Sequence, residues 1–471
     1  MTAAHRSRRG GGGAPGAVRS ARGAAFAALT AFAADRRVRV DAALDRFGLP
    51  ARDAALALEI ARGVVRRQAL LDHVAAGHCA RGLPNDPRLL AALRVGIYQL
   101  LFLERVPAHA AVGESVELVG PRERGFVNAV LRRVAAAVES RPADPSRPMQ
   151  EVALGAQRRV LLAQPLPDPA EDLPGWLAVV SGLPRILLAR WLAQHGESTT
   201  RALADAADRR PGLHLRAVAV TRDELAARLI AERVEVEPAV HPRLLRWTGG
   251  ALPFTSEAFA AGLFVVQDPT AVRAAEAVGA EEGERVLDLC AAPGTKATLL
   301  AEAVGARGAV AAFDLDDTRR AKIAENAARL RMPWLRVVTD PGDSAPFDRV
   351  LVDAPCSNTG VLARRVEVRH RLEPETIEWM ARGQRELLQR ALELVRPGGR
   401  VVYATCSIEP EECDAVVETV LAAGGAQLVQ RELTWPDPPL HDGGYHALLR
   451  RDGGDQGAAP AAALRPDGAA C

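Results

Sequence analysis

Hydrophobic residues recur at helical spacing in the first third of the chain. Two apolar stripes with intervals of three, four or seven residues consist of Leu56, Ile60, Val64 and Leu71, and of Leu90, Leu93, Ile97 and Leu101. Such spacing places each stripe on one face of a helix. Pro107 and Pro121 stand where further helices are expected to begin, because proline favours the first helical turn. The pattern predicts an all-α domain over residues 21–140.

The pattern changes after residue 260 to short apolar runs separated by helical stretches. The predicted strands are residues 285–290, 309–314, 335–339, 347–353 and 399–404. A helical stretch such as 316–330 lies between several of them. Near-continuous apolar strands that alternate with helices are typical of a parallel sheet covered on both faces. Residues 261–450 are therefore predicted to form an α/β, Rossmann-like doubly wound domain.

The remaining segments differ in composition. Residues 141–176 contain seven prolines and are predicted to be a linker. Residues 177–260 mix helical "PRILLARWLAQHG" with strand-like "LHLRAVAV", which predicts a small α+β domain. Residues 1–20 are rich in Gly and Arg without an acidic residue, and residues 451–471 are mostly Ala, Gly and Asp. Both tails are predicted to be disordered.

Composition excludes several classes of protein. No apolar run approaches the roughly 18 residues of a membrane span, and the N-terminal arginines are not followed by the apolar core of a signal peptide. A cytoplasmic protein is expected. The six cysteines are scattered without metal-binding spacing, so no metal is expected. The net charge of +2 is nearly neutral and indicates no partner. Only Lys296 and Lys322 are lysines.

Candidate chemical groups lie at the carboxyl ends of the predicted strands. The first strand runs into "CAAPGTK", a turn of small residues that opens a helix and allows close approach to a ligand. Asp314 and Asp340 end the second and third strands. This turn is not GxGxxG and the chain has no GxxxxGK[ST], which argues against a nicotinamide oxidoreductase and a P-loop protein. Ligands of open parallel sheets bind at this edge.

Two thiols and a carboxylate end the next two strands. "LVDAPCS" carries Asp353 and Cys356, and "YATCS" carries Cys406. The thiols are expected to face one pocket from neighbouring strands. A thiolate is a strong nucleophile, so the pattern favours covalent chemistry.

These residues carry a resemblance to a known family. "LDLCAAPGTKATLLAE", "VDAPCSNTG" and "YATCSIEPEE" resemble the Sun-type S-adenosylmethionine-dependent RNA cytosine-C5 methyltransferases, and "VQDPTA" resembles the lead-in motif of that family. The N-terminal "IYQLLFLERVPAHAAVGESVELV" and "RGFVNAVLRR" resemble the NusB-type RNA-binding domain. The fusion of the two resembles the RsmB-like bacterial 16S rRNA methyltransferases.

The resemblance implies a cofactor and a role for each site residue. The turn that would line the S-adenosylmethionine site consists of Cys290, Ala291, Ala292, Pro293, Gly294, Thr295 and Lys296. Asp314 would hold the ribose and Asp340 would lie by the adenine. Asp353 would contact the cytosine, Cys406 would be the nucleophile, and Cys356 would assist product release.

The implied chemistry accounts for the two thiols. Addition of a thiolate to C6 makes C5 of cytosine nucleophilic, and a proton at N3 helps that addition. Asp353 could supply this proton if burial raised its pKa. The second thiol would help to expel the first after methyl transfer. The base must be unpaired or flipped out to reach such a pocket, which favours a structured rRNA loop.

Alternatives follow from other classes of protein. The same chemistry could act on tRNA, and the chain could be a non-catalytic ribosome-assembly factor that binds RNA. The intact acid and thiols argue against the second alternative.

The sequence also departs from the family pattern in two places. Thr295 stands where a second Gly is usual, and "ARRVEVRHRL" at 363–372 replaces a His-Pro-Asp stretch.

Overall fold

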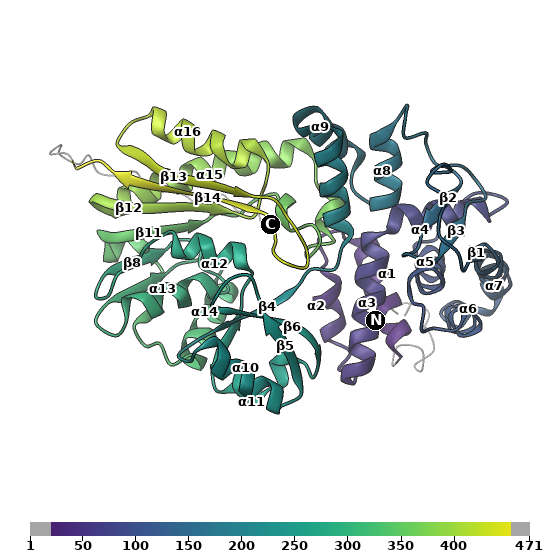
Figure 1. Ribbon diagram of the computed structural model, residues 1–471, viewed down its shortest axis with the longest axis horizontal. Coiled ribbons are helices and arrows are strands. Elements are labelled where there is room, and N and C mark those ends of the chain that lie inside the picture. The colour runs from purple at the N-terminus through teal and green to yellow at the C-terminus, as the bar shows by residue number, and fades with distance from the viewer. Residues whose placement is uncertain (1–19, 454–471) are drawn as a thin grey trace, which may run out of the picture.

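The structure, a computed structural model, describes residues 20–453 and has a helical half and an α/β half (Figure 1). Nearly all of the two tails that the sequence predicts to be disordered lies outside these residues. Within the described range no helix is long and apolar enough to cross a membrane.

Helices make up the chain from residue 21 to residue 136. They are α1 (Ala21–Ala34), α2 (Val40–Asp45), α3 (Ala51–Arg66), α4 (Gln68–Gly77), α5 (Pro87–Phe102), α6 (Ala108–Val116) and α7 (Pro121–Ala136). Pro107 directly precedes α6, and Pro121 is the first residue of α7. Most of the two predicted stripes is buried in one core, including Ile60 and Ile97. The helical pattern is confirmed.

The Pro-rich segment 141–176 was expected to be a linker, but it folds against the helices. Strands β1 (Val138–Glu139), β2 (Glu151–Ala153) and β3 (Arg159–Leu161) form an antiparallel sheet in the order β1-β3-β2. Leu154 and Val160 are buried in the helical core. Most of the prolines lie in the turns beside these strands, where they shorten the strands without preventing a folded segment.

Two helices stand between the halves of the molecule (Figure 1). They are α8 (Leu173–Ser181) and α9 (Arg185–Asp208), and Gly196 at φ +76° breaks the backbone of α9. Trp191 of α9 is buried with Val368 and Ile408 of the α/β half. These helices were expected to belong to the small α+β domain, but their core lies with loops of the large sheet.

The small α+β domain begins at β4. Its elements are β4 (Leu213–Ala217), α10 (Arg222–Ala231), β5 (Val234–Pro238), β6 (Leu244–Gly250), η2 (Pro253–Thr255), α11 (Glu257–Ala260) and β7 (Phe264–Val266). The antiparallel sheet has the order β5-β6-β4-β7. Leu215 of β4 pairs with Val266 of β7, so this domain extends past residue 260.

The large sheet and its helices form the rest of the described chain. The elements are α12 (Pro269–Glu276), β8 (Arg285–Asp288), α13 (Thr295–Val304), β9 (Ala309–Ala312), α14 (Asp317–Arg329), β10 (Leu335–Val337), η3 (Pro341–Ser344), β11 (Phe347–Asp353), η4 (Thr359–Val361), η5 (Val368–His370), α15 (Pro374–Leu394), β12 (Val395–Thr405), η6 (Pro410–Glu412), α16 (Asp414–Ala422), β13 (Ala426–Thr434) and β14 (Gly444–Arg451).

The described strands of this sheet have the order β10-β9-β8-β11-β12-β14-β13. The first five are parallel, and β14 and β13 are antiparallel additions. Helices α12, α13 and α14 cover one face, and α15 and α16 cover the other (Figure 1). The predicted doubly wound α/β fold is confirmed, and all five predicted strands are present.

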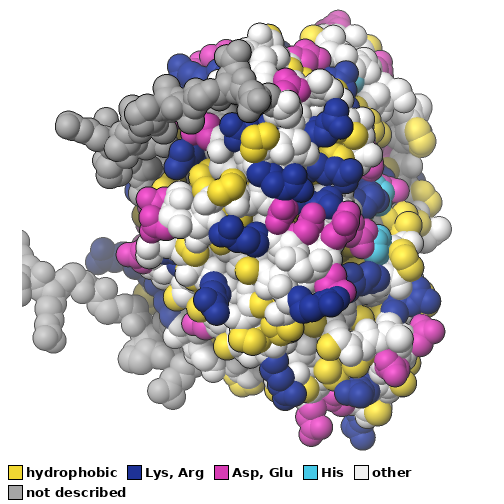
Figure 2. Space-filling model, turned by 90° about the vertical axis from the view of Figure 1, so that its left-hand side faces the viewer, with side chains coloured by type: hydrophobic (Ala, Val, Ile, Leu, Met, Phe, Trp, Pro, Cys, Tyr) yellow, Lys and Arg dark blue, Asp and Glu magenta, His cyan; other side chains and the backbone are white. Residues whose placement is uncertain are grey.

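The two ends of the parallel strands in the large sheet have different surroundings. The carboxyl ends of the parallel strands point toward the helical half of the molecule (Figure 1). The amino ends lie on the opposite side, where acidic and basic side chains are intermixed (Figure 2). Ion pairs near these strand starts include Arg349 with Glu284 and Arg396 with Asp348. The candidate acids and thiols, which follow the carboxyl ends of the strands, therefore lie on the side that faces the helical half.

Gly182 tests the packing of α8 on α3. It follows α8 with φ +69°, and a Cβ there would lie 2.1 Å from the carbonyl oxygen of Arg66. We expect Gly182→Ala to lower the free energy of unfolding by about 2–4 kcal/mol, because backbone strain and overpacking add. Denaturant unfolding measures this loss.

Gly82→Ala is the matched control. Gly82 has φ +76° with nothing within 4 Å of an added Cβ, so only the strain of about 1–2 kcal/mol applies. Equal losses in the two variants would contradict the close approach of α8 to α3.

Candidate active site

The small-residue turn lies between β8 and α13, where the resemblance expects the cofactor. Gly294 has φ +99°, a conformation that glycine adopts without strain, and α13 begins at the next residue. Asp314 is buried and accepts a hydrogen bond of 3.3 Å from the backbone N–H of Ala292. The adjoining Leu315 side chain is 86% exposed. An acid and an apolar side chain therefore lie beside a backbone turn without bulky groups.

Asp340 follows β10, the strand next to β9 in the sheet. It is exposed, and its Oδ1 accepts a hydrogen bond of 2.7 Å from the backbone N–H of Gly342 at the start of η3. That contact is a helix cap. A place for Asp340 beside the adenine stays a prediction.

Asp353 forms an ion pair with Lys296 across the turn. Lys296 Nζ lies 2.5 Å from Asp353 Oδ2. Burial acts to lower the pKa of Lys296, but the Asp353 and Asp288 carboxylates outweigh it and raise that pKa above its usual value. The Asp353 side chain is 35% exposed. The protonated partner in this pair is Lys296.

Asp288 is a third acid in this group that the sequence analysis did not single out. It ends β8 and is fully buried, and neither carboxylate oxygen makes a hydrogen bond of ordinary geometry within the described residues. Burial, aided by the charge of Asp353, raises the pKa of Asp288 to about 7. Its sequence signal is an acid inside the apolar run "RVLDLC".

The two predicted thiols are brought together. Cys356 Sγ and Cys406 Sγ lie 3.0 Å apart, and Cys356 is buried. Hydrogen bonding to Cys356, together with burial, raises the pKa of Cys406 well above its usual value. Asn358, which sequence analysis missed, accepts a hydrogen bond of 3.4 Å from Cys406 Sγ and donates one of 2.6 Å to the carbonyl of Cys356. The amide therefore contacts both cysteines.

A buried carboxylate joins the two loops that carry the thiols. Glu412 is fully buried and accepts a hydrogen bond of 2.8 Å from the backbone N–H of Ser357 and one of 3.0 Å from Gln384 Nε2. The hydroxyls of Ser357 and Ser407 lie 3.3 Å apart beside it. Each serine directly follows one of the thiols, so Glu412 fixes the loops relative to each other.

Helix α9 supports the second loop from outside. Trp191 Nε1 donates a hydrogen bond of 2.9 Å to Glu409 Oε1, and Arg190 Nε donates one of 2.9 Å to Glu409 Oε2. Glu409 is fully buried and lies three residues after Cys406. An element outside the sheet therefore holds the loop of the second thiol.

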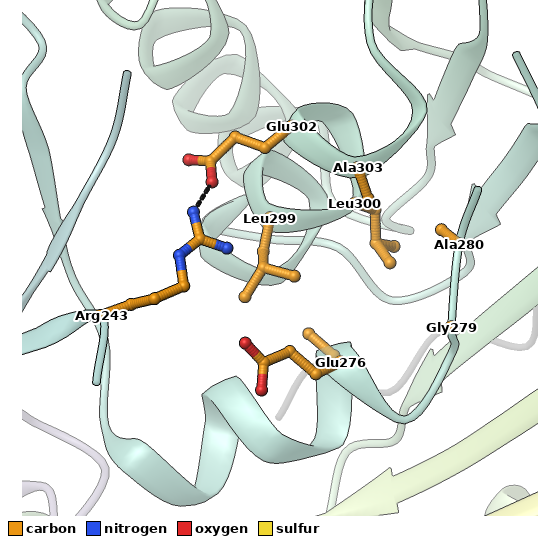
Figure 3. Close-up of a pocket in the computed structure, with 9 residues that line it drawn as sticks. Arg243, Glu276, Gly279, Ala280, Leu299, Leu300, Glu302 and Ala303 are labelled. Atoms are coloured by element: carbon orange, nitrogen blue, oxygen red, sulfur yellow. Dashed lines mark hydrogen bonds and ion pairs between the residues drawn. The ribbon is translucent and has the colours of Figure 1, made fainter. Parts of the chain in front are cut away.

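A separate cavity of about 310 Å³ lies on the far part of α13 (Figure 3). Arg243 and Glu302 both line it and form an ion pair with each other, and Glu276 of α12 points into it (Figure 3). Neither cysteine of the thiol pair lines this cavity, so it is distinct from the candidate site.

Sequence comparisons place these features in a family context. Residues 275–442 match the family model for 16S rRNA methyltransferase RsmB/F, and residues 19–136 match the NusB family. The chain is 32% identical to the ribosomal RNA small subunit methyltransferase B of Vibrio cholerae, with 85% of this chain and 90% of that protein covered. It is 38% identical to a Mycobacterium tuberculosis protein named as a methyltransferase, with 82% and 83% covered.

Solved structures share the fold. The crystal structure of PH0851 has a TM-score of 0.71 at 24% identity and covers 93% of this chain and 99% of that one. NSun6 from Pyrococcus horikoshii, solved with SFG, has a TM-score of 0.52 at 20% identity and covers 57% and 98%. At these identities the likeness concerns the fold.

The raised pKa of Asp288 predicts a pH-dependent stability. The pKa is about 7 in the folded protein, against an ordinary value of 3.8, so stability falls as the pH rises through this interval. Asp288→Asn removes the charge, and we expect it to be more stable than the wild type at pH 8 by up to about 4 kcal/mol. The advantage should shrink towards pH 5. Urea unfolding at several pH values measures this, and parallel stability curves would refute it.

Proposed function

The chain belongs to the RsmB/F family of S-adenosylmethionine-dependent RNA methyltransferases, with a NusB-family domain at its N-terminal end, and we propose that it methylates C5 of a cytosine in 16S rRNA. The observation that carries the proposal is the pair of thiols 3.0 Å apart beside the Lys296–Asp353 ion pair. Methylation at cytosine C5 needs a nucleophile, a means of expelling it and a proton at the base, and these groups can meet all three needs.

The turn and its neighbours suit the cofactor. The residues from Cys290 to Gly294 have small side chains, which allow a ligand to approach the backbone closely. Asp314 is buried against the turn, where it can accept hydrogen bonds from a ribose. The exposed Leu315 side chain offers an apolar contact to a base. When bound there, S-adenosylmethionine supplies the methyl group.

Cys406 is the proposed nucleophile, and its sulfur adds to C6 of the cytosine. The raised pKa of Cys406 means that the thiol must lose its proton as this bond forms, and this proton replaces the one that the Lys296–Asp353 pair gives to the base. N3 gains a proton from the Lys296–Asp353 pair, in which Asp353 contacts the base and Lys296 holds the proton. Electron density then shifts to C5, which becomes the carbon that accepts the methyl group.

Cys356 is proposed to assist the final step. The C5 proton passes to the Cys356 sulfur acting as a thiolate base, the C5–H electron pair forms the C5–C6 double bond, and the C6–S bond breaks with its electron pair returning to Cys406. The Cys356 sulfur lies 3.0 Å from that atom. Asn358 holds the Cys356 backbone while contacting Cys406, so the two sulfurs stay aligned while the product is released.

RNA binding is assigned to the helical domain and the small α+β domain by family relationship. The cytosine must be unpaired or flipped out to reach the two thiols, which lie in the loops after the carboxyl ends of β11 and β12. Two alternatives stay testable: the same chemistry on tRNA, and RNA binding without chemistry as a ribosome-assembly factor. The intact thiol pair favours an enzyme.

Radiolabelled methyl transfer tests the proposal directly. The full chain is incubated with labelled S-adenosylmethionine in three separate reactions, which contain 16S rRNA, 23S rRNA or tRNA. We expect 5-methylcytidine in digested 16S rRNA alone. Label found only in tRNA would mean that the substrate is tRNA. Binding of 16S rRNA without methyl transfer would support the alternative of a non-catalytic ribosome-assembly factor.

Asp314 tests the cofactor site. We expect Asp314→Ala to weaken S-adenosylmethionine binding by about 1.5–3 kcal/mol, because a charged hydrogen-bond partner is lost. Calorimetric titration gives the affinity. Asp317→Ala is the control. This substitution removes an equal charge nearby, but the Asp317 side chain is 87% exposed and is not buried against the turn. Equal affinities of the two variants would remove Asp314 from the site.

The order of bond making separates the two thiols. Cys406→Ala should form no covalent adduct and methylate negligibly. Cys356→Ala should add to the base, transfer the methyl group and then stall as a protein–RNA conjugate that survives denaturing electrophoresis and disappears on proteolysis.

The double variant controls this experiment and should show no conjugate. A conjugate that accumulates in Cys406→Ala but not in Cys356→Ala would reverse the two roles. The absence of a conjugate from both single variants would leave Cys356 without a role in release.

A further inference from the structure

Arg369 is a buried cation whose partners lie in four different parts of the chain. Its side chain donates hydrogen bonds to the carbonyl oxygens of Arg66 at 2.8 Å, Ser181 at 2.8 Å, Ala207 at 3.0 Å and Leu362 at 3.1 Å. It is 3% exposed. It lies in "ARRVEVRHRL", the stretch that departs from the family pattern.

Three of these carbonyls belong to the last turns of helices. Arg66 ends α3, Ser181 ends α8, and Ala207 is the penultimate residue of α9. The last carbonyls of a helix lack partners within it, and they carry the negative end of its dipole. One guanidinium has enough donors in a planar array to satisfy several such groups at once. Arg369 therefore joins three helix ends to its own loop.

Contacts on either side of Arg369 fix the same segment to the N-terminal helices. His370 Nε2 lies 2.7 Å from the carbonyl of Val65, and Glu367 Oε1 accepts a hydrogen bond of 3.0 Å from the N–H of Val40. Arg66 Nη2 donates one of 3.0 Å to the carbonyl of Ala363. The fully buried side chain of Val366 is part of the helical core.

The segment is continuous with the loop of the thiol pair. Leu362, whose carbonyl Arg369 holds, lies six residues after Cys356. Between them, the N–H of Gly360 donates a hydrogen bond of 2.9 Å to the carbonyl of Cys406. A Cβ on Gly360 would lie 2.7 Å from that carbonyl oxygen. Movement at Leu362 is therefore passed to both thiols.

From this connection we infer that Arg369 is a positioning residue through which the N-terminal helical domain keeps the Cys356 loop in place opposite Cys406. The inference rests on the proposed function for its effect on turnover. It adds to that function a contribution of the helical domain to the chemistry itself, besides any contact of this domain with RNA.

The rate at which Cys356 and Cys406 form a disulfide reports their alignment without any RNA. Diamide accepts the two electrons and two protons of the thiols and becomes a hydrazine, and peptide mass mapping identifies the disulfide. In the full chain we expect Arg369→Lys to slow this disulfide at least tenfold, because an ammonium cannot contact the four carbonyls in this geometry. Val366→Ala, a milder change in the same segment, should slow it less.

Arg67→Met is the matched control. Arg67 Nη2 pairs with Asp208 Oδ2 at 2.5 Å, which joins α9 to the N-terminal helices, and within the described residues neither side chain makes a hydrogen bond to the 362–370 segment. This variant should form the disulfide at the wild-type rate. A wild-type rate in both Arg369→Lys and Val366→Ala would overturn the inference, whatever their melting temperatures.

Turnover on 16S rRNA is the second readout. We expect Arg369→Lys to lower kcat at least tenfold with unchanged affinity for S-adenosylmethionine, and to accumulate more protein–RNA conjugate per product than Arg67→Met. Equal kcat and conjugate in these two variants would contradict the inference. A wild-type chain that methylates no RNA would refute the proposed function instead, and the disulfide rates would still decide the role of Arg369.

Discussion

The parallel pairing of β11 with β12 is the constraint on which the site depends. Asp353 pairs with Ala404, so the two strands end at the same level and the loops that follow carry Cys356 and Cys406 side by side. A slip of one residue would move one strand end by about 3.3 Å. That shift is as large as the separation of the two sulfurs, 3.0 Å. Backbone register therefore determines whether the thiols can act together.

Register alone leaves the loops free beyond the last ladder bond, and buried ionic groups hold them there. Glu412 joins the loops from within, and the guanidinium of Arg369 holds one of them against three helix ends. The two charge types have complementary uses: a carboxylate accepts from backbone N–H groups, whereas a guanidinium donates to carbonyls. Lys296, one of two lysines in a chain with 60 basic residues, provides a point charge beside Asp353. Glu412 and Arg369 thus each match the polarity of the backbone groups that they satisfy.

Sequence predicts the strand ends well, because an apolar run followed by a small-residue turn is a local signal. The fold and the meeting of Cys356 with Cys406 follow from that signal and from the geometry of parallel sheets. Asp340 has the same local signal, and its carboxylate caps the next turn. Glu412 could not be told from Glu411, because its burial depends on Ser357, which is 55 residues away. The partners of Arg369 and His370 in α3 are still more distant, about 300 residues back.

The insertion of Val366 into the helical core bears on how such a protein can change over generations. Because a valine of one domain is buried in the interior of the other, the two domains must change in sequence together. A substitution on one side alone would leave a void or cause a clash. Recombination that exchanged the N-terminal domain at its boundary would separate this side chain from the pocket that receives it. A working chimera of two relatives would have to carry the stretch from Leu362 to His370 along with the helices, although more than 200 residues separate them in the gene product.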